Sequence, residues 1–293
     1  MKYTVHAGHA PAGRIGCGAV GFCHESTVAR AIKDAVIFWL KFDGHLAVDC
    51  TYESGGTQSY ILSQIKKKIN VEQNVTANIS IHLNANKKVS RDGKVKGSEV
   101  WIYPGDINAN NYGNRILANL RKLGFTNRSV KTSTSLAVLK GITNGGTNLL
   151  VECFFCDDQD DFDLYSKVGI SAMGKAIAEG IVGHSIGSVG SVDTNKYVYT
   201  DKEFGKLDMR PVFEPSYYRN RYSDIAAACG SDAKLFEHFL VFGMKEGRQA
   251  CSDFNVQVYK ERYSDLKAVY GQDLKKYYLH YCKFGKTEGR KGI

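Results

Sequence analysis

Short apolar segments typical of strands alternate with longer segments of helical periodicity over the first 183 residues. One such helix is predicted to begin near Glu25, with Ala29, Ile32 and Val36 on one face, and to end at Gly44. We expect further helices at 57–69, 107–123 and 166–182, and strands at 2–6, 46–51, 77–83, 98–103, 130–134, 137–139 and 148–153. This alternation predicts an α/β domain with a mainly parallel, twisted sheet flanked by helices over residues 1–183.

The composition changes after residue 183. Residues 184–205 are rich in Gly, Ser and polar residues and are expected to form a linker. Residues 206–293 hold two copies of a repeat of about 41 residues, which predicts a small, mostly helical second domain. The matching segments are Tyr217–Ile225 with Val258–Leu266 and Phe242–Arg248 with Phe284–Arg290. Each copy is predicted to contain two short helices, joined at Gly230 or at Gly271.

The chain is basic, with 39 Lys and Arg against 30 Asp and Glu and a net charge of +9 over 293 residues. This excess favours an anionic partner, such as nucleic acid, an acidic membrane surface or an anionic cell-wall polymer. No segment approaches the length of a membrane span, and no apolar stretch of a signal peptide precedes the first strand. We therefore expect synthesis in the cytoplasm and no membrane insertion, so that an extracellular target would be reached only after release.

The eight cysteines do not form a recognisable metal or disulfide framework. The one Cys-x-x-Cys motif, Cys153 to Cys156, has no second pair at the spacing of a zinc ribbon. We expect most of the cysteines to be reduced and buried.

Four residues at the ends of predicted elements carry the candidate chemistry. His9 follows the first strand, Glu25 begins the first helix, and His82 ends the strand at 77–83. The carboxyl ends of parallel strands share one edge of a sheet, so these residues can meet there. Two His and one carboxylate are the ligands of an open Zn²⁺ site that activates water. Glu152, near the end of an apolar strand, could then serve as general base.

Each of these residues also has a structural interpretation. A single His at a strand end is more often a loop residue with ordinary hydrogen bonds, and Glu25 could simply favour a helix N-terminus. His6 and His24 lie beside the candidate residues and could be confused with them. The residue pattern alone leaves the metal site open.

Five motifs occur in an order that resembles a known family. They are Gly8-His9-Ala10, Gly18-x-x-Gly21-x-x-x-Glu25, Ser80-Ile81-His82-Leu83-Asn84-Ala85, Gly97-Ser98-Glu99-Val100 and Leu150-Val151-Glu152-Cys153-Phe154-Phe155. Together they resemble the zinc-dependent N-acetylmuramoyl-L-alanine amidases of the Amidase_3 type, especially those of clostridial phage endolysins and autolysins. Ala10 departs from the usual Gly of that family.

The resemblance implies a peptidoglycan hydrolase that uses Zn²⁺-activated water. It implies Zn²⁺ bound by His9, Glu25 and His82, with Glu152 catalytic. Asn84, in the same motif as His82, is a candidate substrate contact. The scissile bond would be the amide between N-acetylmuramic acid and L-alanine. The implied protein is a bacteriolytic endolysin that is made in the bacterial cytoplasm and acts on the wall of Gram-positive, clostridial-type cells after release.

The repeats are expected to bind peptidoglycan and its anionic wall polymer. Candidate contacts are Tyr217, Tyr218, Tyr259 and Tyr263, although we favour a core position for most of these rings. Two other functions stay open: a zinc peptidase that cuts the stem peptide, and a non-catalytic protein that binds the wall or nucleic acid. No familiar nucleic-acid-binding signature occurs, so nucleic acid is not an expected partner.

Overall fold

The structure, a computed structural model, describes residues 1–86, 94–186, 191–194, 197–229 and 231–293. The chain divides into two compact units, residues 1–186 and residues 187–293. Of the helices in this described part of the chain, none is long and apolar enough to cross a membrane.

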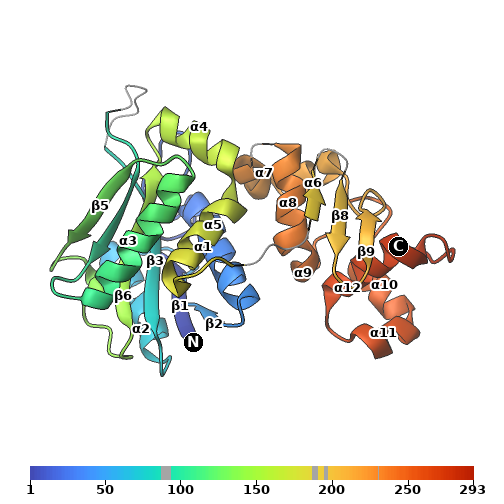
Figure 1. The fold of residues 1–293 in the computed structure, drawn as a ribbon, viewed down its shortest axis with the longest axis horizontal. Helices are drawn as coiled ribbons and strands as arrows, with labels where there is room; N and C mark the ends of the chain where they lie inside the picture. The colour runs from blue at the N-terminus through green and yellow to red at the C-terminus, as the bar shows by residue number, and fades with distance from the viewer. Residues whose placement is uncertain (87–93, 187–190, 195–196, 230) are drawn as a thin grey trace. The chain divides into compact units, whose positions relative to one another are not determined.

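A six-stranded sheet forms the centre of the first unit, in the order β2-β1-β3-β6-β4-β5 (Figure 1). Its strands are β1 (Lys2–Ala7), β2 (Leu46–Asp49), β3 (Ala77–Asn84), β4 (Ser98–Ile102), β5 (Asn127–Thr132) and β6 (Thr147–Phe155). The first four strands of this order run parallel. β4 pairs with β6 in the antiparallel direction, and β5 runs parallel to β4. The predicted α/β fold with a mainly parallel sheet is confirmed.

Helices cover both faces of this sheet (Figure 1). They are α1 (Glu25–Phe42), α2 (Gln58–Asn70), α3 (Ile107–Lys122), α4 (Gln159–Val168) and α5 (Ile170–Val182). α1, α3 and α5 pack together on one face. α2 packs on the other face through Ile61, Ile65 and Ile69, which are fully buried and match the predicted helical spacing.

Two predictions for the first unit need correction. The helix expected at 166–182 is interrupted at Gly169, which adopts φ +84. The residues before it end α4, and the residues after it form α5. Residues Ala137–Leu139 form a 3₁₀ turn and not a strand. Val138 and Leu139 pack against Leu150 across the face of the sheet, so their apolar character reflects burial on that face.

The second unit begins with a small sheet where a linker was expected. Its antiparallel strands are β7 (Ser191–Asp193), β8 (Val198–Asp201) and β9 (Gly205–Asp208). Lys275 of the second repeat donates hydrogen bonds to the side chains of Tyr199 and Asp201, at 3.0 and 3.2 Å. The ring of Tyr197 packs against Phe213 and Phe236. Much of the segment 184–205 is therefore part of the repeat unit.

Among the described residues, the first repeat contains four short helices and the second repeat contains three, instead of the predicted two in each. The first repeat has α6 (Pro215–Arg221), α7 (Ser223–Cys229), α8 (Asp232–His238) and a π-helical turn that leads into α9 (Met244–Glu246). The second has α10 (Val256–Arg262), α11 (Ser264–Tyr270), α12 (Leu274–His280) and a second π-helical turn. The additional break follows Tyr222 and Tyr263, whose backbones leave the helical region and end the first helix of each copy.

Matching polar pairs lie inside the two repeats. Tyr218 and Tyr259 are fully buried, and their hydroxyls lie 3.0 and 3.1 Å from Nδ1 of His238 and His280. Burial lowers the pKa of His238 to about 3, so its ring is neutral and shares a hydrogen bond with the hydroxyl of Tyr218. These two tyrosines are packing residues of the repeats and present no ring to a ligand.

Candidate metal centre and catalytic site

Glu25 lies at the centre of the predicted metal site. It is the first residue of α1 and is 3% exposed. Two backbone amides orient its carboxylate: Leu83 donates to Oε1 at 3.2 Å and Ala19 donates to Oε2 at 2.9 Å. Burial by itself would raise the pKa of Glu25, but hydrogen bonds and charge from His82 and His9 hold it below its usual range. The carboxylate is therefore ionised, as a metal ligand must be.

The structure brings His9 and His82 onto this carboxylate. Oε1 of Glu25 lies 3.1 Å from Nδ1 of His82 and 3.3 Å from Nε2 of His9. The two rings are nearly perpendicular, with their centroids 4.9 Å apart. One ligand atom from each of the three residues lies within 4.8 Å of the others. Two imidazoles and a carboxylate at this separation fit a tetrahedral Zn²⁺ with one open position.

Two glycines make room for this cluster. A Cβ on Gly8 would lie 1.7 Å from Nε2 of His82, so the imidazole occupies the space of the missing side chain. Gly18 adopts φ +79, and a Cβ there would lie 2.6 Å from Oε2 of Glu25. Both glycines stood in the sequence motifs, but only the structure shows which ligand each accommodates.

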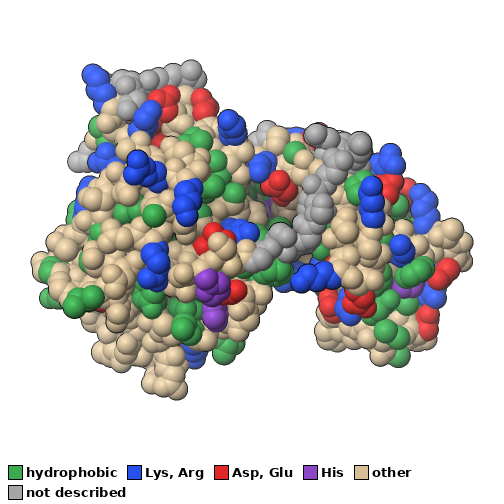
Figure 2. Space-filling model, viewed as in Figure 1, with side chains coloured by type: hydrophobic (Ala, Val, Ile, Leu, Met, Phe, Trp, Pro, Cys, Tyr) green, Lys and Arg blue, Asp and Glu red, His purple; other side chains and the backbone are tan. Residues whose placement is uncertain are grey.

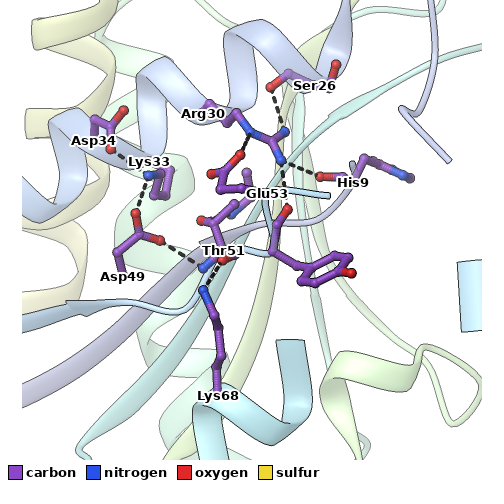
Figure 3. Close-up of polar contacts among 11 residues, drawn as sticks. His9, Ser26, Arg30, Lys33, Asp34, Asp49, Thr51, Glu53 and Lys68 are labelled. Atoms are coloured by element: carbon purple, nitrogen blue, oxygen red, sulfur yellow. Dashed lines mark hydrogen bonds and ion pairs between the residues drawn. The ribbon is translucent and has the colours of Figure 1, made fainter. Parts of the chain in front are cut away.

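Arg30 of α1 holds the backbone that carries His9 (Figure 3). Its guanidinium donates to the carbonyl oxygens of His9 and Tyr52, at 2.8 and 3.1 Å, and to Oε2 of Glu53 at 3.0 Å. One side chain therefore connects the loop after β1 to the loop after β2. This role has no signal in the sequence, since an Arg on an amphipathic helix does not reveal its partners.

Lys33 and Asp49 add a second connection from α1 to the sheet (Figure 3). Nζ of the buried Lys33 lies 2.6 Å from Oδ2 of Asp49, and Oδ1 of Asp49 accepts a hydrogen bond from the amide of Thr51 at 2.8 Å. The hydroxyl of Thr51 in turn accepts from the amide of Ala7, next to Gly8. This chain of contacts fixes the position of β1 where it enters the site.

Glu152 lies on β6, directly opposite His82 of β3 in the sheet register. Its Oε2 is buried and has no hydrogen-bond partner among the described residues. Burial raises the pKa of Glu152 well above its usual value, and the nearby carboxylates of Glu25 and Glu99 raise it further. A buried carboxyl group with a perturbed pKa and an unpartnered oxygen beside a candidate metal site is suited to general acid–base catalysis.

The remaining candidates have different surroundings. Asn84 is close to the site, but its amide already donates to Oε1 of Glu99 at 2.8 Å and its Oδ1 accepts from the amide of Ala85 at 2.9 Å. His6 is buried within β1, outside the ligand cluster, and His24 precedes α1. The eight cysteines all belong to the described residues, and none of them forms a disulfide.

The comparisons with known proteins place residues 4–183 in a known family. A family model described as N-acetylmuramoyl-L-alanine amidase, of the Amidase_3 type, matches residues 4–183. The chain belongs to this family. The match covers the first unit up to the end of α5, which includes all four candidate residues. The resemblance found from the motifs is confirmed, and the chain is a member of a peptidoglycan amidase family.

Two curated relatives are proteins of Clostridium perfringens. The chain is 31% identical over 182 residues to an uncharacterized protein of Clostridium perfringens, CPE1502; the match covers 62% of this chain and 51% of that protein. A second uncharacterized protein of Clostridium perfringens, of 38.4 kDa, is 26% identical over 182 residues, with the same coverage. The chain thus spans about half the length of these curated relatives.

Solved structures share the fold of the first unit. The catalytic domain of the CD27L endolysin, which targets Clostridia difficile, is 27% identical, with a TM-score of 0.56 over 64% of this chain and 99% of that domain. The CwlD amidase of Clostridioides difficile, in complex with the GerS lipoprotein, is 20% identical with a TM-score of 0.52, over 62% of this chain and 98% of CwlD. At 20% identity, the similarity to CwlD shows a shared fold and nothing more.

Proposed function

We propose that the first unit is a zinc-dependent N-acetylmuramoyl-L-alanine amidase, with His9, Glu25 and His82 as metal ligands and Glu152 as general base. The observation that carries this proposal is the cluster of three ligand atoms within 4.8 Å, inside a unit that matches the amidase family. The donor set fits Zn²⁺, since neutral imidazoles and one ionised carboxylate are ligands that this ion prefers.

Bound Zn²⁺ would act as a Lewis acid at the carbonyl of the scissile amide and on the attacking water. The chain supplies the remaining groups. Glu152, in its ionised form, takes the proton of the attacking water on a carboxylate oxygen and returns it to the leaving amine of L-alanine. The amides of Leu83 and Ala19 and the side chain of Arg30 hold Glu25 and His9 in place, so that little reorganisation is needed during the reaction.

We further propose that the chain acts as a phage-type endolysin that lyses Gram-positive, clostridial-type cells. The similarity to the CD27L endolysin domain supports this role. Synthesis in the cytoplasm and action on the wall after release would follow from it. An anionic wall polymer is the proposed partner, because the net charge is +9 and Lys and Arg side chains are spread over the face seen in Figure 2.

The repeat unit is the proposed wall-binding domain. It contains a cavity of about 410 Å³, lined by the partly exposed ring of Tyr197 and by charged groups such as Arg210 and Lys286. Aromatic and charged side chains together suit a sugar-containing anionic polymer better than the buried Tyr218 and Tyr259 do.

The test is a digestion of purified clostridial-type peptidoglycan, with and without a metal chelator, followed by identification of the new terminus. We expect chelator-sensitive release of N-terminal L-alanine without new reducing sugar ends. A different new amino terminus would assign a zinc peptidase, and binding without any new terminus would assign a non-catalytic wall-binding protein.

A further inference from the structure

A buried carboxylate on β4 holds two cations from the neighbouring strand. Glu99 is 3% exposed, and its Oε2 accepts from Nε of Arg128 at 2.9 Å and from Nζ of Lys131 at 2.6 Å. Its Oε1 accepts from the side chains of Asn84 and Trp101, at 2.8 and 3.1 Å. All four donors serve one carboxylate, and two of them are charged. The cluster therefore keeps a net positive charge.

An irregular backbone brings both cations to the same carboxylate. Residues 128 and 131 are three positions apart, and a regular strand would direct them to opposite faces of the sheet. Ser129 adopts φ +72, its amide donates to Oδ1 of Asn127 at 2.8 Å, and the pairing of β4 with β5 shifts beside it. Such a conformation costs a residue other than glycine about 1–3 kcal/mol, and residues held in it cluster at active sites and ligand clamps.

The cluster lies beside the candidate catalytic residue. Glu99 pairs directly with Glu152 across β4 and β6, so both side chains project from the same face of the sheet. Neighbouring strands are about 4.8 Å apart, so Glu99 is one spacing and β5 two spacings from Glu152. The cations of β5 reach back to Glu99 and therefore lie roughly 5–10 Å from Glu152. A peptide extends about 3.3–3.6 Å per residue, so this distance corresponds to one to three residues.

Part of the hydrogen-bonding capacity of the two cations is unused. Arg128 and Lys131 side chains are 28% and 30% exposed. Within the described part of the chain, the guanidinium of Arg128 makes its only hydrogen bond through Nε, which leaves both terminal amino groups for another anion. The ring of Phe155 lies 4.8 Å from this guanidinium and the ring of Trp101 lies 5.3 Å from Nζ of Lys131, which restricts their motion.

We propose that Arg128 and Lys131, held by Glu99, bind a carboxylate of the peptide stem on the leaving-group side of the scissile amide. This inference rests on the proposed amidase function. It explains why a strained bulge gathers two cations at the edge of the sheet where the candidate metal ligands lie. A network that only neutralises Glu99 would need one cation and no bulge. The subsite selects peptides with a free carboxylate one to three residues beyond the cleaved bond.

The experiment compares two soluble substrates, N-acetylmuramoyl-L-alanyl-D-glutamate and the same molecule with both carboxylates of its glutamate converted to amides. The wild-type chain, loaded with Zn²⁺, is expected to favour the carboxylate form by about tenfold in kcat/KM, the size of one charge-assisted hydrogen bond. In Lys131→Gln and in Arg128→Gln we expect KM for the carboxylate form to rise about tenfold. The kcat should stay within twofold, and the amide form should be unaffected.

Lys67→Gln is the matched control, because it removes one exposed positive charge from α2. It should leave kcat and KM unchanged for both substrates. Each single variant leaves one cation on Glu99, and thermal unfolding checks that it folds. Equal losses on both substrates, or no preference in the wild-type chain, would overturn the subsite while leaving the amidase intact. If the wild-type chain releases L-alanyl peptides from neither substrate, the proposed function itself fails, and the subsite with it.

Discussion

Replacing Gly8 with alanine should remove the metal site while leaving the fold in place. The new Cβ would lie 1.7 Å from Nε2 and 1.8 Å from Cε1 of His82. Ordinary contacts of a Cβ begin near 3.4 Å, so the ring would have to move by about 1.7 Å. The amide of Gly8 donates to the carbonyl of Ile81 at 3.2 Å, so the backbone of β1 cannot easily move away.

The expected loss of Zn²⁺ affinity follows from the narrow range of ligand distances that metal coordination tolerates. Ligand distances in metal sites vary by only about 0.2 Å, and disturbing groups that merely orient a ligand already costs about 10–100-fold in affinity. A displacement of about 1.7 Å removes His82 as a ligand altogether. We therefore expect the Zn²⁺ dissociation constant to rise by at least about a hundredfold, with a parallel loss of amidase activity.

The assay is a competition titration of Zn²⁺ against a chromophoric chelator, accompanied by thermal unfolding of the metal-free chain. Gly13→Ala is the control, because its Cβ would meet nothing within 4 Å although its φ is +79. That control should lose about 1 kcal/mol of stability and keep its Zn²⁺ affinity within about threefold. A folded Gly8→Ala variant with near wild-type affinity would refute the packing argument.

Three further predictions concern the base, a buried histidine and the second unit. Glu152→Gln should fold and bind Zn²⁺ but lose at least about a hundredfold in kcat; undiminished hydrolysis would remove Glu152 from the mechanism. Because burial lowers the pKa of His238 from 6.5 to about 3, the unfolded chain binds a proton first as pH falls. Stability should therefore drop below pH 6.5, by about 2 kcal/mol at pH 5, and His238→Gln should weaken that dependence in denaturant titrations. A fragment of residues 187–293 should sediment with clostridial-type walls. It should also be more stable than a fragment of residues 206–293, which lacks the partners of Lys275. If the 187–293 fragment stays in the supernatant while the full chain sediments, the targeting role is excluded.

Much of the first unit could be predicted from local patterns. Strands and helices with different apolar periods specify an α/β domain, and the ends of its parallel strands must share an edge. This rule was enough to group His9, Glu25 and His82, because each stands immediately beside a strand end or a helix start. Their proximity in the structure therefore follows from topology more than from packing detail.

The second unit could be predicted only in outline. Its repeat was visible in the sequence, but the break after Tyr222 was not, since a single residue with a non-helical backbone leaves the apolar pattern unchanged. The strands at 191–208 are short and polar, and they gain their partners from Lys275 and from the rings near Phe213. Such contacts connect residues far apart in the sequence and have no local signal.

The sequence by itself determined the fold class, the family and the residues at the strand ends, because these depend on periodicity and short motifs. Only the tertiary structure decided that β4 reverses direction, that Gly8 makes room for His82 and that Glu99 gathers Arg128 and Lys131. A charged residue on a strand shows neither its partner nor the bulge of the neighbouring strand. Those are set by which strands pair and in which register, and pairing energies come from contacts between distant segments.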